Sequence, residues 1–248
     1  MPFIQTDTYA LRTYECDAHG CLHVPALMNL MQESANRNAA DYGISMADVA
    51  AHGLGWMLMR FGLTMHHYPQ VGQSIRVTTY PTTVDKYFIY RDFQVRAPDD
   101  TLLAEATSTW LVFGQQKRSM VPLPDFIRAV AIPEAIRPLP KLMLKPDFAA
   151  TTLHPDRETS VQVGWFSIDT NQHVNNVAYV QWLLDAAGAE WLTNHRLTAL
   201  DVVYRGETHI GTQLRLQTEV TTPDTLRHQL SDQTGRDVVL AQTRWKRE

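Results

Sequence analysis

The sequence contains little cysteine and no long apolar run. Only Cys16 and Cys21 are present among 248 residues, and no Cys-x-x-Cys or histidine–cysteine pattern accompanies them. These features argue against a zinc domain or a disulfide scaffold. No stretch approaches the roughly 18–20 apolar residues of a membrane helix, and no basic-then-apolar secretory signal opens the chain. We therefore expect reduced thiols, no metal ion, no membrane span and a cytoplasmic location.

An excess of positive charge is also missing. The formal net charge is −4, which argues against nucleic acid as the main partner. Apolar residues make up 44% of the chain and charged residues 19%, as in ordinary globular proteins. The length suits either one large domain or two of about 120 residues.

The order of the expected elements repeats once along the chain. In the first half the residue pattern predicts a strand at 9–14, helices at 24–40 and 46–51, and strands at 56–66, 74–82, 87–95 and 102–113. In the second half it predicts a strand at 161–166, a helix at 176–192, and strands at 200–207, 213–220, 225–230 and 238–245. Only the short helix at 46–51 lacks a counterpart.

Individual residues match between the halves as well. Asp17 corresponds to Asp169 at a shift of 152 (169 − 17), and Gly72 corresponds to Gly211 at a shift of 139 (211 − 72). The extra short helix accounts for the difference of 13 (152 − 139) between the two shifts. Two matches in the same order indicate a duplicated chain.

A proline-rich segment separates the halves. Seven prolines lie between residues 121 and 155, and this density predicts a stiff, mostly extended connection. We therefore expect domains at 1–115 and 161–248, joined by a linker at 116–160. Because one helix and several antiparallel strands bury each other best as two layers, each half is predicted to be an α+β unit with a long helix wrapped by a curved sheet.

Polar residues gather immediately before the second-half helix. Asp169, Asn171 and His173 alternate along the chain, so they would face one side if the segment were extended. Asn175 or Asn176 suits the N-cap of the helix, whose free N–H groups favour developing negative charge. An amide can hold a carbonyl, an imidazole can move a proton and a carboxylate can orient either group. This set suits hydrolysis or proton transfer.

The ordinary alternative is that these residues only form a turn and a cap. The first half offers a comparison, because its matching positions hold Asp17, His19 and Cys21. At most one half therefore carries the full set. A Cys21–His19 nucleophile pair is also conceivable, but it lacks a recognisable third partner.

A second candidate lies in the run Tyr204-Arg205-Gly206-Glu207, a polar end to an apolar strand. The glycine lets another group approach the backbone closely. Glu207 has the chemistry of a base that activates water. Taken alone this signal is weak, because most glutamates near strand ends are simply solvated.

Together these residues resemble the acyl-acyl carrier protein thioesterases of plants and bacteria, which are double hotdog proteins. The resemblance covers nearly the whole chain and is most specific at the Asp-x-Asn-x-His-Val-Asn-Asn motif of residues 169–176. It implies hydrolysis of a fatty acyl thioester on acyl carrier protein (ACP), with a catalytic set of Asp169, Asn171, His173 and Glu207. It also implies that the first hotdog supplies most of the acyl pocket and the second the catalysis.

The expected substrate-binding residues are Met28, Met31, Trp56 and Arg205. Methionine suits an adaptable wall around a fatty chain, although an ordinary core would hold the same residues. Because ACP is acidic, docking should use basic residues. The candidates are Arg205, Lys117–Arg118 and Lys246–Arg247.

Some family members carry a cysteine after the catalytic glutamate, where this chain has Thr208. Direct attack by water is therefore the better interpretation. The resemblance implies no cofactor, and the absence of the transit segment of plant members suggests a bacterial cytoplasmic enzyme. A double hotdog already contains the pairing that single hotdogs obtain by dimerising, so either a monomer or a homodimer is expected.

Three alternatives stay open at the level of sequence. An acyl-coenzyme A thioesterase would use the same residues. A hydratase would need an aspartate–histidine pair, for which Asp17 and His23 are the nearest match. A non-enzymatic acyl-binding module would not need the four-residue set at all.

Overall fold

The computed structural model describes residues 3–116, 119–134, 138–139 and 153–248. The chain divides into two compact units, Met1–Lys141 and Leu142–Glu248. None of the described helices is long and apolar enough to cross a membrane. The domain limits 1–115, 116–160 and 161–248 stay predictions.

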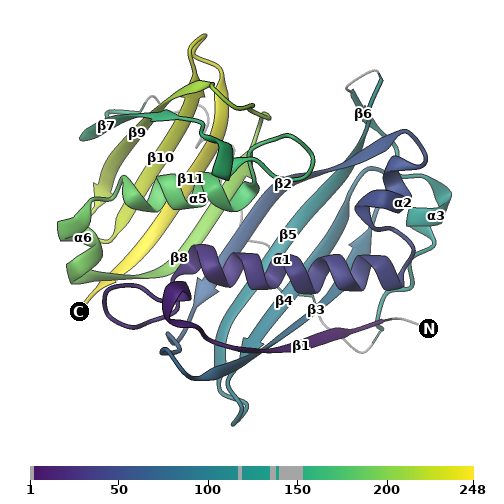
Figure 1. Cartoon of the computed structure of the whole chain (residues 1–248), viewed down its shortest axis with the longest axis horizontal. Helices are drawn as coiled ribbons and strands as arrows, with labels where there is room; N and C mark the ends of the chain where they lie inside the picture. The colour runs from purple at the N-terminus through teal and green to yellow at the C-terminus, as the bar shows by residue number, and fades with distance from the viewer. Residues whose placement is uncertain (1–2, 117–118, 135–137, 140–152) are drawn as a thin grey trace. The chain divides into compact units, whose positions relative to one another are not determined.

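The first unit packs one long helix against an antiparallel sheet (Figure 1). Its strands pair in the order β1-β3-β4-β5-β2, and β6 adds to β5. The elements are β1 (Gln5–Ala10), α1 (Val24–Asp41), α2 (Met46–Ala50), β2 (Leu54–Met65), β3 (Ser74–Val84), β4 (Ile89–Arg96), β5 (Leu102–Gly114), β6 (Ser119–Val121) and α3 (Asp125–Arg128). The helix predicted at 24–40 is confirmed.

Helix α1 begins after an N-cap residue and has a proline in its first turn. The His23 side chain accepts a hydrogen bond from the Ala26 N–H, and Pro25 occupies the first turn, where a missing N–H costs nothing. Leu27, Met28 and Met31 on its inner face are at most 3% exposed. Full burial of such a side chain contributes about 1.5–3 kcal/mol, so this face fixes the helix on the sheet.

The second unit repeats the same topology. Its strands pair in the order β7-β9-β10-β11-β8, which matches the first unit strand for strand. The elements are β7 (Arg157–Gln162), α5 (Asn176–Asp185), α6 (Ala189–Asn194), β8 (His195–Tyr204), β9 (Gln213–Thr222), β10 (Thr225–Asp232) and β11 (Asp237–Arg247). The predicted duplication and the α+β class are thereby confirmed.

Several predicted bounds were wrong. The strands expected at 9–14 and 161–166 lie four residues earlier, as β1 and β7, because these polar edge strands lack an apolar run to reveal them. The helix expected at 176–192 is divided into two: α5 ends at Asp185, and Gly188, with a φ of +86°, is the N-cap of α6.

The proline-rich segment was also predicted wrongly in part. Helix α3 forms within it, and Pro124 at the N-cap does not obstruct the helix because it precedes the first turn. Ile127 of α3 is fully buried in a cluster with Ile44, Val49 and Val112. The rest of the predicted extended connection lies mostly outside the described residues.

Each unit buries a basic side chain that is hydrogen-bonded to neutral groups. In the first unit, Arg91 of β4 donates to Asn38 Oδ1 at 2.7 Å and to Thr79 Oγ1 at 3.1 Å. In the second unit, the two ring nitrogens of His228 each lie 3.0 Å from a buried hydroxyl, on Thr218 and on Thr243. Burial lowers the pKa of His228 to about 3.

We expect the second unit to lose stability in mild acid because of His228. Its folded pKa lies below the ordinary value of 6.5, so the unfolded chain binds the proton first and the folded state is destabilised between about pH 6.5 and pH 3. The contribution should reach about 1–2 kcal/mol between pH 7 and pH 5. Urea unfolding at several pH values should show this loss in the native chain and less of it in His228→Gln. Parallel pH dependences in both proteins would contradict a buried neutral imidazole.

Candidate active site

Residues 169–173 form a tight turn, not the extended segment that the sequence suggested. The Asp169 N–H donates to the His173 carbonyl at 2.8 Å, and Ile168 and Val174 form an antiparallel bridge at the base of the turn. Gln172 has a φ of +66°, which is unusual for a residue other than glycine. The polar side chains are therefore brought together by a turn and not by strand alternation.

The Asp169 carboxylate holds this turn from inside. Its Oδ1 accepts from the Asn171 N–H at 2.8 Å and from the His173 N–H at 3.4 Å, and its Oδ2 accepts from the Asn171 side chain at 3.4 Å. Charge-assisted bonds of this kind are stronger than neutral ones. Asp169 therefore shapes the backbone that carries the other two residues.

Helix α5 begins directly after the turn. Asn175 is its N-cap, as predicted, and the Asn175 side chain accepts from the Val177 N–H at 2.8 Å. The Asn175 N–H donates to the Ser167 carbonyl at 2.8 Å, which fixes the entry of the chain into the helix. The turn is thus held at the positive end of the helix dipole.

The structure brings His173 and Glu207 together. Nε2 of His173 lies 3.4 Å from Oε2 of Glu207, and each side chain is 22% exposed, so both reach solvent. The strand predicted to continue to residue 207 ends at Tyr204, because the Arg205 and Gly206 N–H groups both donate to the Val238 carbonyl. Glu207 consequently lies on the loop beyond β8.

The residue after Glu207 anchors that loop. The Thr208 carbonyl accepts from the Val174 N–H at 3.1 Å, and the Thr208 hydroxyl lies 2.6 Å from the Tyr179 hydroxyl of α5. Burial raises the pKa of Tyr179 to about 12, and the nearby Glu207 and Asp169 charges add to the effect. Tyr179 therefore stays neutral and able to hydrogen-bond. Its hydroxyl was not among the predicted site groups.

The first unit contains the same turn without the same chemistry. Asp17 Oδ1 accepts from the His19 N–H at 2.9 Å and from the Cys21 N–H at 3.1 Å, and the Asp17 N–H donates to the Cys21 carbonyl at 2.8 Å. The position that matches Glu207 at the shift of 139 is Tyr68. The Cys21 thiol is buried and lies 3.9 Å from the His19 carbonyl oxygen.

The remaining predicted residues lie in different surroundings. Met28 and Met31 are buried on α1, and the Trp56 indole of β2 donates to the Ile44 carbonyl at 2.9 Å. Arg205 follows β8, but its guanidinium pairs with Asp237 at 3.1 Å. Of the proposed docking residues, Lys117 and Arg118 lie outside the described residues.

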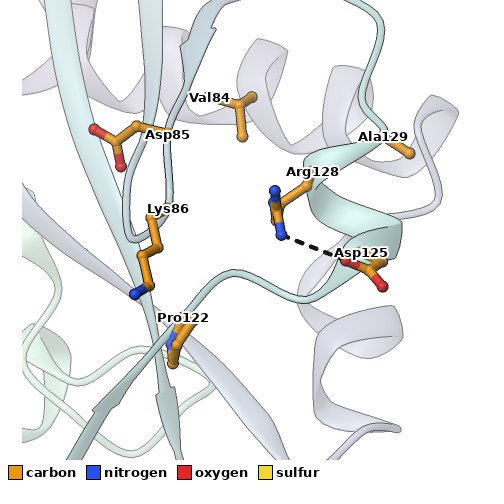
Figure 2. Close-up of a pocket in the computed structure, with 7 residues that line it drawn as sticks. All are labelled: Val84, Asp85, Lys86, Pro122, Asp125, Arg128 and Ala129. Atoms are coloured by element: carbon orange, nitrogen blue, oxygen red, sulfur yellow. Dashed lines mark ion pairs between the residues drawn. The ribbon is translucent and has the colours of Figure 1, made fainter.

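A separate pocket of about 740 Å³ lies in the first unit (Figure 2). Its lining residues are Val84, Asp85, Lys86, Pro122, Asp125, Arg128 and Ala129. Figure 2 shows Arg128 paired with Asp125, at 3.6 Å, across one side of the pocket. Four of the seven lining residues are charged and none is a predicted acyl-binding residue, so this pocket does not suit a fatty chain.

The site chemistry thus comes from one carboxylate–imidazole pair, one amide and a helix N-terminus. Such groups can activate water and stabilise an oxyanion. Across the described ranges, no group of three or more His, Cys, Asp or Glu side chains is placed to hold a metal ion. His209, whose ring lies 5.0 Å from that of His173, also belongs to this surface and was not predicted.

Known proteins resemble this chain over nearly its full length. A chloroplastic acyl-[acyl-carrier-protein] hydrolase of Cuphea viscosissima is 26% identical over 99% of the chain. A chloroplastic palmitoyl-acyl carrier protein thioesterase of Arabidopsis thaliana is 27% identical over 96%. These matches span 64% and 62% of the two relatives, so the chain covers less than two thirds of their length.

Solved structures share the fold. The 12:0-ACP thioesterase of Umbellularia californica matches with a TM-score of 0.84 and 24% identity, over 99% of this chain and 98% of that one. An acyl-ACP thioesterase of Bacteroides thetaiotaomicron matches with a TM-score of 0.83 and 20% identity, over 98% of each chain. The expected double hotdog is thereby confirmed.

Two family models cover most of the sequence. The acyl-ACP thioesterase N-terminal domain matches residues 3–131, and the acyl-ACP thioesterase C-terminal domain matches residues 151–247. The four-residue set Asp169, Asn171, His173 and Glu207 lies within the second match. The chain therefore belongs to the acyl-ACP thioesterase family.

Proposed function

We propose that the chain hydrolyses a fatty acyl thioester carried on ACP. Water adds to the thioester carbonyl, the carbon–sulfur bond breaks, and the products are a free fatty acid and the carrier thiol. The observation that carries the proposal is the 3.4 Å contact between His173 Nε2 and Glu207 Oε2 beside the turn before α5. Family membership supports the choice of substrate.

In this proposal Glu207 and His173 together take a proton from the attacking water. Both side chains are partly exposed, so water can reach them. A hydrolytic base must lie within hydrogen-bond reach of water, and a shared carboxylate–imidazole pair meets that need. No covalent intermediate is required, in agreement with a threonine at position 208.

The oxyanion needs donors at the same place. We assign this role to the Asn171 amide and to the N-terminus of α5. The Val177 and Ala178 N–H groups already donate to Asn175, so the Asn176 N–H is the candidate that remains in the first turn. The leaving group is a thiolate, which departs without strong acid catalysis.

Asp169 is assigned a positioning role. Its carboxylate is occupied by the backbone N–H groups of its own turn, and Asp17 makes the same bonds where no Asn–His set follows. The acyl chain is assigned to the first unit, where Met28, Met31 and Trp56 lie on or beside α1 and β2. Methionines adapt well to a flexible hydrocarbon chain.

Removing the proton acceptor should abolish most of the activity. Glu207→Gln and His173→Ala should each lower the turnover of acyl-ACP by roughly 10²–10⁴, the usual cost of losing a positioned base. Steady-state hydrolysis of acyl-ACP of several chain lengths, with thermal unfolding measured in parallel, would check this. A folded Glu207→Gln protein with native turnover would refute the assignment. The turnover of acyl-coenzyme A should be measured in the same assays, because faster hydrolysis of acyl-coenzyme A than of acyl-ACP would indicate the alternative, an acyl-coenzyme A thioesterase.

The two equivalent aspartates provide a matched pair of variants. Asp17→Ala and Asp169→Ala each remove two hydrogen bonds to backbone N–H groups, so both should lower stability by roughly 1–3 kcal/mol. Only Asp169→Ala should also lower turnover, because only its turn carries Asn171 and His173. Equal losses of turnover in both variants would contradict this division.

Carrier docking is proposed to use exposed basic residues of the second unit. Lys246 and Arg247 at the end of β11 are exposed, and Arg205 is already paired with Asp237. Lys246→Glu with Arg247→Glu should raise the KM for acyl-ACP several-fold and reduce its salt dependence, because ACP is acidic. The KM for acyl-coenzyme A provides the control and should change little. An unchanged KM for acyl-ACP would remove this surface from the proposal.

We further propose a cytoplasmic location and a monomeric or homodimeric state without a cofactor, as expected from the sequence.

A further inference from the structure

A second imidazole lies against the proposed catalytic histidine. The His209 ring centroid is 5.0 Å from that of His173, with the ring planes inclined by 48°. Nδ1 of His209 lies 3.3 Å from the Gln172 carbonyl oxygen. Because a carbonyl only accepts, Nδ1 carries the hydrogen when this bond forms. His209 therefore contacts both the turn and the residue at its end.

The first unit shows how the turn is held without such a side chain. The loop after Tyr68 forms a two-residue bridge with the turn, in which the Leu22 N–H donates to the Pro69 carbonyl and the Val71 N–H donates to the Gly20 carbonyl, both at 2.9 Å. The bridge pairs Cys21 with Gln70. Only backbone groups make these bonds between the loop and the turn.

In the second unit only half of that bridge is present. The Val174 N–H still donates to the Thr208 carbonyl at 3.1 Å, which matches the first bond. The second bond would join the Ile210 N–H to the Gln172 carbonyl, and it is not formed among the residues that the structure describes. The His209 imidazole donates to that carbonyl in its place.

The other bonds of the two loops do correspond. The Gly211 N–H donates to Val163 as the Gly72 N–H donates to Leu11, at 2.9 and 3.2 Å. Thr212 and Gln73 also make matching bonds to the carbonyls of His209 and Gln70. The exchange of a backbone donor for a side-chain donor is thus local to the carbonyl beside His173.

We propose that His209 is a positioning residue of the site, and that its imidazole holds the Gln172 carbonyl so that His173 faces Glu207. This inference rests on the proposed hydrolase function. Gln172 has a φ of +66°, whereas the matching residue is a glycine with a φ of +75°. A non-glycine residue in this conformation is strained by about 1 kcal/mol, so the hydrogen bond from His209 to its carbonyl helps to hold it in place.

We expect the loss of His209 to change kcat more than KM. In the proposal His209 acts through the turn, so its loss should displace His173 and lower kcat, with little change in KM. A small displacement of a catalytic group reduces rates strongly, and we expect roughly tenfold or more. A role in binding the substrate would instead raise the KM.

Three substitutions of His209 test whether the position of its N–H donor matters, as opposed to the size of its ring. His209→Ala removes the donor. His209→Asn restores an N–H near the Nδ1 position, and His209→Gln places it farther out, near Nε2. Steady-state kinetics on acyl-ACP should rank kcat as native, then Asn, with Gln and Ala lowest.

A matched variant exists in the first unit. Gln70 is the residue that corresponds to His209, and there the Val71 N–H holds the turn. Gln70→Ala should therefore keep native kcat and KM. His52→Gln provides a second control, since His52 is an exposed histidine whose Nδ1 also meets a carbonyl, that of Asp48, at 2.9 Å.

Amide hydrogen exchange tests the inference independently of activity. His209→Ala should raise the exchange rates of the Asn171 and His173 amides, His209→Asn should restore them, and the His19 and Cys21 amides should not respond. If the native protein hydrolyses no acyl thioester, the proposed function fails while this measurement still tests the contact. Native kcat in His209→Ala, a raised KM alone, or unchanged exchange would each overturn the inference.

Discussion

The placement of Asn171 and His173 in the candidate site depends on the hydrogen bonds that the Asp169 carboxylate accepts from its own turn. Those bonds, together with the bond from the Asp169 N–H to the His173 carbonyl, fold five residues back on themselves. The fold of the turn places His173 just before the Asn175 cap. Without it, the imidazole would have no fixed relation to Glu207 or to the helix N-terminus.

The duplicated fold separates this scaffold from the chemistry it carries. Asp17 holds an equivalent turn with nearly the same distances, although His19 and Cys21 replace the amide and the imidazole. The carboxylate therefore accompanies the turn in both units but does not by itself make the site. Function lies in a few side chains placed on a shared backbone, here at the positions that follow the aspartate and at Glu207.

Local chemistry explains what the sequence could predict. Helix α1, the Asn175 cap and the duplication follow from apolar spacing, capping residues and matching positions. The edge strands β1 and β7 were displaced because their polar residues carry no strong pattern. The turn at 169–173 could not be predicted, because alternation in sequence does not reveal which N–H groups a carboxylate will bind. His209 was missed for a related reason, since its proposed role depends on the absence, among the described residues, of a backbone bond from the Ile210 N–H to the Gln172 carbonyl, which the sequence does not reveal.

That absent bond also distinguishes the second copy of the turn from the first. A backbone N–H cannot be varied by substitution, whereas a side-chain donor can change in reach, size and charge. In the first unit the Val71 N–H donates to the Gly20 carbonyl, and in the second unit the His209 side chain donates to the equivalent Gln172 carbonyl, which therefore still has a hydrogen-bond partner. Gln172 also has a conformation that glycine adopts more easily, a strain of the kind that gathers at functional sites. The Gln172 carbonyl is thus held by a side chain that also lies against the His173 imidazole.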